Sequence, residues 1–471
     1  MVISKMNANF QSSWFGHPRG LFLLSGTELW ECFSFYAMRA ILILYLTDQT
    51  VNGGLGWTIQ DALRLSAIYS ALLCLTPVLG GWIADNYLGQ RRSIIIGGIL
   101  MAIGHFMLAV PNNMINLHVL QVFYVGLSFL IVGNGLFRPN IFTMVGALYR
   151  EGDTRLDGAF TIFYMGINIG ALLSGVIAGT ASTYYNWKAG FLCAGIGMLI
   201  SLFTQLLFAN RYLGNIGIEP VAKKQRRTSD SNRKQPLTLI ERDRLKAMVI
   251  MGLFVVIFWA GFNQADGLMN IYSQQHTDRM IGAFEVPAAW FQSLNPMFVI
   301  ILAPLFAMLW RYLGDNEPSS PIKSAMGMLF LAVGFICMIG AVMQQDSDIS
   351  VKASMWWLVA AYFFHTLGEL CLSPIGLSLI TKLAPLRLLS VTMGAWFSSS
   401  AIANYIAGFI GSHVDDAGPL TIFGGIAITA VIAGILFVMC SSTLVEWMHG
   451  AEKKAVRTQV KTDVQILSVV P

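Results

Sequence analysis

Long apolar stretches separated by short polar breaks run along almost the whole chain. Each stretch is close to the length of about 20 residues that an α-helix needs to cross the hydrocarbon core of a bilayer. The stretches are continuous and do not alternate between apolar and polar residues, so they favour helices over the strands of a β-barrel. Twelve spans are predicted, at 21–47, 62–84, 92–110, 116–148, 157–181, 188–209, 246–272, 288–312, 323–343, 353–381, 388–411 and 420–441.

The longest polar segment lies in the middle of the chain. It runs from Arg211 to Lys246 and contains the sequence KKQRRTSDSNRKQ, which is typical of a solvated linker. We therefore expect two bundles of six helices each. The predicted parts are an N-terminal tail at 1–20, bundles at 21–210 and 246–443, a linker at 211–245 and a C-terminal tail at 444–471.

The composition agrees with an all-α polytopic membrane protein. Hydrophobic residues make up 55% of the chain and charged residues only 12%, whereas soluble domains carry about 25% charged residues. All the cysteines fall inside predicted spans, so no disulfide and no metal site are expected. The sequence contains no nucleotide-binding loop and no nucleophile motif, and we expect neither an enzyme nor a cofactor.

The positions of the 30 lysines and arginines predict the orientation. Most of them lie in the two tails, in the central linker and in the loops on the same side. By the positive-inside rule, both termini are predicted to be cytoplasmic. We expect a multi-pass protein of the plasma membrane, the inner membrane of a bacterium, with the lipid bilayer as its surroundings. The net charge of +5 follows from this topology and gives no reason to expect nucleic acid as a partner.

Six ionisable side chains stand out within the predicted spans. A charge at the centre of a membrane helix costs about 2.5–3.5 kcal/mol on insertion scales, so each one requires a partner, a wet cavity or a function. They lie on spans 1, 4, 7 and 10, which begin successive three-helix units and are expected to line a central cavity. Static ion pairs that hold the bundles together remain the alternative. The six residues are Glu28, Glu31, Arg39, Arg138, Asp266 and Glu369.

The depth of three of these charges predicts a common layer. Counted from the nearest basic residue at the cytoplasmic side, Glu31, Arg138 and Glu369 lie roughly 18–20 Å deep at the helical rise. We therefore expect them to converge near the middle of the membrane, with Arg138 and Glu369 attracting each other across an empty cavity. His105 in span 3 is expected to be a packing residue without a proton-carrying role.

The stretch GGWIADNYLGQRR at 80–92 resembles the loop between helices 2 and 3 of the major facilitator superfamily. Gly81 would permit close approach of helices, and Asp85 could accept from a helix N-terminus or a neighbouring cation. Gly89 would turn the chain before Arg91 and Arg92, which would anchor the cytoplasmic face.

Further stretches narrow the resemblance to the proton-dependent oligopeptide transporters. They are GTELWECFSFYAMRAILILYL, GNGLFRPNI, FYMGINIGALLSG, EVPAAWFQSLNPMF, LGELCLSPIGLSLI and MGAWFSSSAIANYIAG, which together cover nearly the whole chain. The resemblance implies a symporter that imports di- and tripeptides or peptide-like compounds by alternating access. It also implies the proton as coupling ion, no cofactor and a monomer as the functional unit.

In that family, a motif ExxERFxYY in span 1 couples protons. Its two acids correspond to Glu28 and Glu31, which are both present. Cys32 replaces the arginine of the motif, and Phe35 replaces the first tyrosine, whereas Tyr36 is retained. The resemblance assigns these residues to proton coupling and substrate binding, and the cavity is expected to be less basic than in the family.

The resemblance also assigns residues to the two ends of a peptide. Tyr69 is the tyrosine of span 2, and Arg138 stands where the family has a lysine that meets the peptide carboxylate. Asn168, Asn295 and Glu369 correspond to the polar cluster at the amino end, with Glu369 also linked to proton coupling. A zwitterionic substrate is expected to separate Arg138 from Glu369 by offering each an opposite charge.

Spans 7 and 11 supply the remaining predicted residues. Trp396, Phe397 and Ser400 match the pocket for the substrate's side chains, although aromatic residues at helical spacing also occur as ordinary packing. In span 7 the sequence FNQ lacks the family's glutamate, and Asp266, about one turn further on, is expected to pair with Arg39 instead.

Two other functions remain open at this stage. The same fold could carry another cargo, such as a modified amino acid, a siderophore-like metabolite or an exported peptide product. Cys32 keeps this alternative open, because without the arginine of the span 1 motif only Arg138 is left to meet a carboxylate. A receptor that kept the fold and lost transport is the other alternative. Uptake of a labelled dipeptide would distinguish them.

Overall fold

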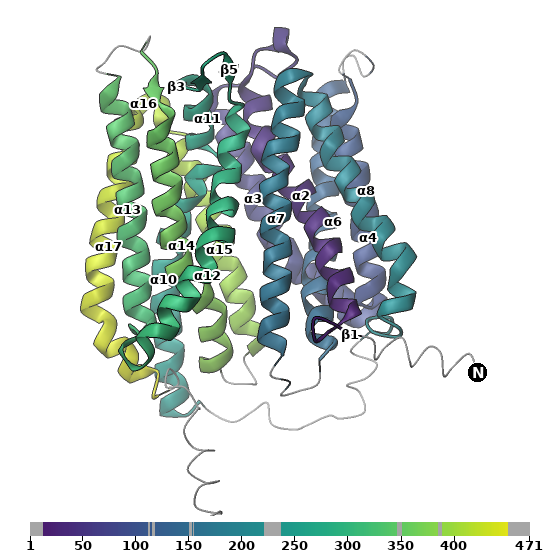
Figure 1. Ribbon diagram of the computed structural model, residues 1–471, viewed down its shortest axis with the longest axis vertical. Coiled ribbons are helices and arrows are strands. Elements are labelled where there is room, and N and C mark those ends of the chain that lie inside the picture. The colour runs from purple at the N-terminus through teal and green to yellow at the C-terminus, as the bar shows by residue number, and fades with distance from the viewer. Residues whose placement is uncertain are drawn as a thin grey trace, which may run out of the picture.

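The computed structural model describes residues 13–111, 114, 118–149, 153, 155–220, 237–345, 351–384 and 389–450. Within these ranges, the side chains at 157, 315, 373–382, 389–391 and 393–397 are not described. The chain folds into long helices that run roughly side by side between two faces (Figure 1).

The N-terminal half contains six long helices. They are α2 (Arg19–Thr47), α3 (Ile59–Ile83), α4 (Gln90–Ala109), α6 (Val119–Ala147), α7 (Leu156–Tyr184) and α8 (Trp187–Tyr212). In this half α2 packs on α7 and α8, and α4 packs on α6 and α8. A π-helical turn, η2 (Ala84–Leu88), follows α3 directly, and a short 3₁₀ helix, η1 (Thr50–Asn52), follows α2.

The C-terminal half repeats this plan with one broken helix. Its long helices are α10 (Leu239–Phe262), α12 (Leu294–Leu313), α13 (Ser320–Gln344), α14 (Met355–Leu383), α15 (Leu389–Gly411) and α17 (Pro419–Trp447). Shorter pieces are α11 (Leu268–Gln275), α16 (Val414–Ala417) and the 3₁₀ helices η4 (Asn263–Ala265), η5 (Ala288–Ser293) and η6 (Gly314–Asn316). In this half α13 packs on α14 and α17, and α10 packs on α15 and α17.

Three pairs of two-residue strands complete the described structure. β1 (Ser13–Trp14) pairs antiparallel with β2 (His17–Pro18), and β4 (Met280–Ile281) pairs antiparallel with β5 (Phe284–Glu285). β3 (Thr277–Asp278) pairs parallel with β6 (Ala353–Ser354). These pairs lie at the ends of the helices, and Ala353 of β6 packs in the hydrophobic core of the C-terminal half.

The predicted fold class is confirmed. Among the described residues, 11 helical segments are long and apolar enough to cross a membrane. α15 is also long enough, at 23 residues. Two predicted spans are not single α-helices. The run at 246–272 consists of α10, η4 and the start of α11, and the run at 288–312 consists of η5 and most of α12.

The two halves are joined in the part of the molecule that lies away from the chain ends. Strand β1 and the C-terminal end of α17 lie at one face, which we call the terminal face (Figure 1). Cross-bundle packing occurs between α3 and α15 and between α7 and the segment formed by η5 and α12. Ser293 donates to the carbonyl of Leu172 at 2.8 Å, and Asn270 donates to the carbonyl of Ala40 at 2.9 Å.

Helices α3 and α6 approach each other at a pair of glycines. A Cβ at Gly80 would overlap the carbonyl oxygen of Gly135. That carbonyl is four residues before Pro139, which has no N–H to bond it within the helix. Close approach was expected at Gly81 instead, but a Cβ there would meet Pro139 at an ordinary 3.6 Å. The assignment is wrong by one residue, which turns the side chain by about 100° around a helix.

We predict that Gly80→Ala destabilises the protein and that Gly81→Ala does not. The added methyl at position 80 must push α3 away from α6, and overpacking of this kind typically costs about 1–3 kcal/mol. Thermal unfolding of the two variants in the same detergent measures the difference. Equal melting temperatures would show that the contact between Gly80 and Gly135 is not tight.

Candidate functional site

Two carboxyl groups and one thiol form a buried cluster on α2. Glu28, Glu31 and Cys32 are all 0% exposed, and their ligand atoms lie within 4.8 Å of one another. Cys32 Sγ lies 3.7 Å from Glu28 Oε1 and 3.5 Å from Glu31 Oε2, so its single S–H can donate to either carboxyl group. We call these three residues the α2 acidic cluster. Two carboxylates so close together repel each other in a low dielectric, and a proton on one of them removes that repulsion.

Helix α6 supplies the positive charge next to this cluster. Arg138 Nε lies 3.8 Å from Glu31 Oε1, and Asn134 donates to the same oxygen at 3.5 Å. The guanidinium carbon of Arg138 also lies 4.0 Å from the centre of the Phe35 ring. The Arg138 side chain is 28% exposed, whereas Glu31 is fully buried. Arg138 therefore connects the acidic cluster with accessible space.

Glu369 occupies a neutral setting on the other bundle. Asn295 from α12 donates to Glu369 Oε2 at 2.8 Å and to Thr366 Oγ1 at 3.1 Å. The predicted ion pair between Arg138 and Glu369 is not among the ion pairs of the described residues. Arg138 is instead paired with Glu31, which belongs to its own bundle, and Asn295 satisfies Glu369 without a charge.

The other predicted binding residues lie at several places around these groups. Tyr36 is half-buried and packs edge-on against Phe35, with ring centres 5.1 Å apart. Tyr69 is buried and lines a small cavity with Glu31. Asn168 is buried, but its amide donates to the carbonyl of Tyr164 in its own helix, at 2.9 Å.

The predicted pocket for the substrate's side chains is described only in part. Ser400 is half-buried, and its carbonyl accepts from the side chain of Asn404 at 2.9 Å. The side chains of Trp396 and Phe397 lie outside the described residues.

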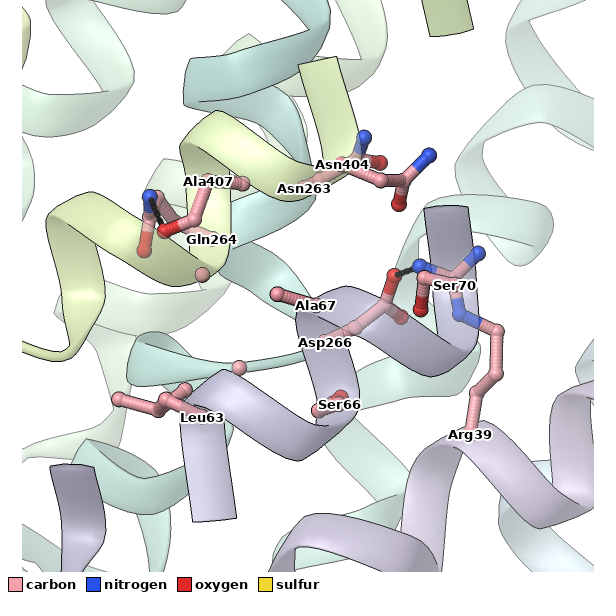
Figure 2. Close-up of a pocket in the computed structure, with 12 residues that line it drawn as sticks. Arg39, Leu63, Ser66, Ala67, Ser70, Asn263, Gln264, Asp266, Asn404 and Ala407 are labelled. Atoms are coloured by element: carbon pink, nitrogen blue, oxygen red, sulfur yellow. Dashed lines mark hydrogen bonds and ion pairs between the residues drawn. The ribbon is translucent and has the colours of Figure 1, made fainter. Parts of the chain in front are cut away.

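Arg39 and Asp266 form an ion pair between the two bundles. Figure 2 shows Arg39 on α2 and Asp266, which follows η4, directed toward each other in a small pocket. Ser66 and Ser70 of α3 line the same pocket. The side chains of Arg39 and Asp266 are only 17% and 24% exposed. Nearby, Gln264 Nε2 donates to the carbonyl of Ala407 at 2.8 Å, which ties η4 to α15.

The loop motif holds helices together at the terminal face. Gly89 has a φ of +79°, and a Cβ there would meet the carbonyl of Ile218. Arg91 is buried and donates to the carbonyl of Gly214 at 2.9 Å and to Asn210 Oδ1 at 2.7 Å, close to the end of α8. Basic groups stabilise the C-terminal end of a helix by satisfying its carbonyls.

The two remaining residues of the motif do not make such contacts. Asp85 is exposed in the π-helical turn η2, and Arg92 is exposed as well. Exposed charges of this kind remain solvated at the ends of membrane helices.

Sequence reasoning missed Asn134 as part of the site. Its signal was its position four residues before Arg138, which places both side chains on one face of α6. Ser34 was also missed, because a single serine in an apolar helix commonly bonds its own backbone.

The family follows from comparison with known proteins. A protein-family model described as the POT family matches residues 91–226 and 221–421. The chain belongs to the POT family. It is 36% identical to "Uncharacterized transporter YclF" of Bacillus subtilis (strain 168), over 93% of this chain and 97% of that one. It is also 35% identical to "Peptide transporter YePEPT" of Yersinia enterocolitica, over 91% and 94%.

A solved structure agrees with this assignment. The crystal structure of a POT family transporter in complex with 5-aminolevulinic acid has a TM-score of 0.85 and 30% identity, covering 93% of this chain and 99% of that one. Members of the family are transporters, so this POT family protein is a multi-pass membrane transporter and not an enzyme.

We predict that removing one partner of the ion pair between the bundles destabilises the protein more than removing both partners. Arg39→Ala or Asp266→Ala leaves an uncompensated charge in the interface, whereas the double variant leaves none. Each single variant should therefore melt at a lower temperature than the double variant. Purified proteins in one detergent provide the measurement.

Arg155 and Asp153 provide the matched control for this prediction. Their ion pair lies at the terminal face, where 53% of the Arg155 side chain is exposed. The hydrogen bonds that Arg155 donates hold the pKa of Asp153 at about 2, but water screens an exposed pair. Arg155→Ala should leave the melting temperature nearly unchanged. Additive single-variant effects at Arg39 and Asp266 would contradict the proposed coupling between the two charges.

Proposed function

We propose that this POT family protein is a proton-coupled symporter that imports di- and tripeptides or peptide-like compounds. The observation that carries the proposal is the contact between Arg138 and Glu31, because it places a proton-binding carboxyl next to a cation that can bind substrate. The similarity to a peptide transporter of Yersinia enterocolitica supports the choice of cargo.

The geometry suggests how proton and substrate are coupled. Arg138 pairs with Glu31 as long as Glu31 is ionised. A proton on Glu31 removes this attraction, and the partly exposed guanidinium becomes free to bind the carboxylate of a substrate. Glu28, linked to Glu31 through Cys32, provides a second site for the proton. Proton binding and carboxylate binding therefore favour each other.

The opposite end of the substrate would meet Glu369. An ammonium group is attracted by this carboxylate, and Asn295 holds its Oε2 atom in place. We assign Asn168 to the same end. Phe35, Tyr36 and Tyr69 would shape the region between the two charges, with Cys32 behind them, and Trp396, Phe397 and Ser400 would contact the substrate's side chains.

Alternating access would arise from rocking of the two bundles. We propose that the N-terminal bundle comprises 21–210 and the C-terminal bundle 246–443. We also propose that the linker at 211–245 and both tails, at 1–20 and 444–471, are cytoplasmic. In the inner membrane of a bacterium, the part of the molecule in which the two bundles are joined would then face outward. The structure would therefore represent an inward-facing conformation. The protein would act as a monomer without a cofactor.

A different cargo on the same site is the second candidate. The similar POT family transporter in complex with 5-aminolevulinic acid favours it, because that ligand carries one amine and one carboxylate but no peptide bond. Arg138 and Glu369 could bind such a molecule through the same two charges. A peptide library tested beside amino acid derivatives would distinguish the two cargoes.

We predict that Glu31→Gln abolishes uptake driven by a proton gradient. The amide cannot release a proton, so the gradient can no longer drive the cycle. Proteoliposomes with an inward proton gradient should accumulate labelled dipeptide with the wild-type protein only, while exchange without a gradient persists in the variant. Asp416→Asn, which changes an exposed acid on α16, is the control and should accumulate dipeptide normally. Gradient-driven uptake by Glu31→Gln would remove Glu31 from the coupling mechanism.

We predict that Arg138 and Glu369 recognise different ends of a peptide. In Arg138→Ala, the concentration of free dipeptide needed to compete with a labelled substrate should rise roughly tenfold or more, as expected for loss of a charged hydrogen bond. The substitution should have little effect on a dipeptide with an amidated C-terminus. Glu369→Gln should show the reverse, with little effect on an N-acetylated dipeptide. Equal losses for free and capped peptides would contradict this orientation.

A further inference from the structure

A small cavity lies beside the α2 acidic cluster, on the side of helices α3, α4 and α6. Its polar lining consists of Glu31, Ser34, Tyr69, His105 and Asn134, and its apolar lining includes Leu73 and Leu130. The cavity has room for about one water molecule, and a water held in such a place usually has 2–4 polar partners. We call it the Glu31 cavity.

His105 is a deeply buried histidine with one nitrogen still available. It is 2% exposed, and its Nε2 lies 2.8 Å from Ser34 Oγ. Its Nδ1 is buried and has no hydrogen-bond partner among the described residues. Leaving such an atom unsatisfied is costly, commonly about 1–3 kcal/mol. The packing role expected for His105 from the sequence leaves this atom unexplained.

Asn134 has the same property on another wall of the cavity. Its amide nitrogen donates to Glu31 Oε1 at 3.5 Å, while its Oδ1 is buried and without a partner among the described residues. Two unpartnered polar atoms of residues that line one small cavity favour a bound water there. Glu31 lines the same cavity and is 0% exposed.

We propose that one water in the Glu31 cavity links the Glu31 carboxyl to His105, so that His105 and Ser34 set the pH at which Glu31 takes up its proton. In this arrangement the protonated carboxyl donates to the water, and the water donates to His105 Nδ1. His105 Nε2–H then donates to Ser34 Oγ. The second hydrogen of the water is donated to Asn134 Oδ1. With His105 in the Nε2–H tautomer, the water then has no hydrogen left for an ionised Glu31 and can only accept from a protonated one, so this network stabilises the protonated form. His105 is thus a positioning residue for proton coupling.

The surroundings of His105 contain few groups that could take over this role. Besides His105, the titratable groups that line the cavity are Glu31 from α2 and Tyr69 from α3. Glu28 and Cys32, also on α2, adjoin Glu31. Helix α6 contributes neutral Asn134, and its Arg138 approaches Glu31. Helix α8 presents Gly195 next to the Cβ of His105.

The inference rests on the proposed role of Glu31, and its test follows the proton directly. Infrared titration of the full-length protein in lipid detects protonated carboxyl groups, and the band that Glu31→Gln lacks belongs to Glu31. His105→Leu removes the acceptor at nearly constant volume. The midpoint of the Glu31 band should then move to a lower pH by roughly one unit, the size expected from loss of one hydrogen bond.

Two further variants control for packing. His105→Asn keeps a polar atom near the position of Nδ1 and should keep the midpoint close to that of the wild type. His365→Leu changes a histidine that is 1% exposed and packs against Phe335 in the other bundle, and it should not move the midpoint. An unchanged midpoint in His105→Leu, or an equal shift in His105→Asn, would overturn the inference.

This experiment separates the inference from the proposed function. If the wild type accumulates no peptide but His105→Leu still shifts the Glu31 band, the cargo is wrong and the link between Glu31 and His105 stands. If peptide uptake depends on Glu31 but the band does not respond to His105, uptake stands and the link is wrong.

Discussion

The burial of two carboxyl groups next to a single guanidinium group is the constraint on which the rest of the site depends. Glu28 and Glu31 are fully buried. Among the described residues, Arg138 forms the ion pair with this cluster, through Glu31. Two negative charges at this place are not balanced by one positive charge. The number of protons on the cluster is therefore tied to the partner that Arg138 selects, and a neutral thiol at Cys32 adds no further positive charge.

Close helix packing places Arg138 where this constraint can act. The residue lies one position before Pro139, which frees the carbonyl of Gly135 from the helix's own hydrogen bonding. Gly80 closes on that carbonyl and fixes α6 against α3. On the other side of α6, Gly133 lies against the carbonyl of Gly97 in α4. Small residues thus set the position of α6, as they commonly do where membrane helices meet.

The helices and most of the charged residues of the site could be predicted from the sequence. A span needs about 20 apolar residues, and a charge within a span is costly enough to require a partner, a wet cavity or a function. Depth along a helix could also be counted from the sequence, and it predicts one layer for Glu31, Arg138 and Glu369. The rotation of each helix about its axis and the identity of its neighbours could not be predicted from the sequence. For this reason the expected pairing of Arg138 with Glu369 is wrong, and Arg138 pairs with Glu31. The break at η4 was missed for a similar reason. The run at 246–272 has the length of one span, and its polar residues near Asp266 did not by themselves indicate a break. The contacts made by Asp266 and Asn270 across the bundles arise only in the folded protein.

Helix α2 connects the α2 acidic cluster with the ion pair between the bundles. Glu31 and Arg39 are eight residues apart, so about 12 Å of continuous helix separates them. Phe35 lies between them in sequence, and the guanidinium carbons of Arg138 and Arg39 lie 4.0 and 5.8 Å from the centre of its ring. An aromatic face attracts cations, so one ring contacts both the arginine paired with Glu31 and the arginine paired with Asp266. In the proposed cycle Arg138 would exchange Glu31 for a substrate carboxylate, and its contact with Phe35 would change as well. Through this one side chain on a continuous helix, a proton on Glu31 would influence the ion pair between the bundles.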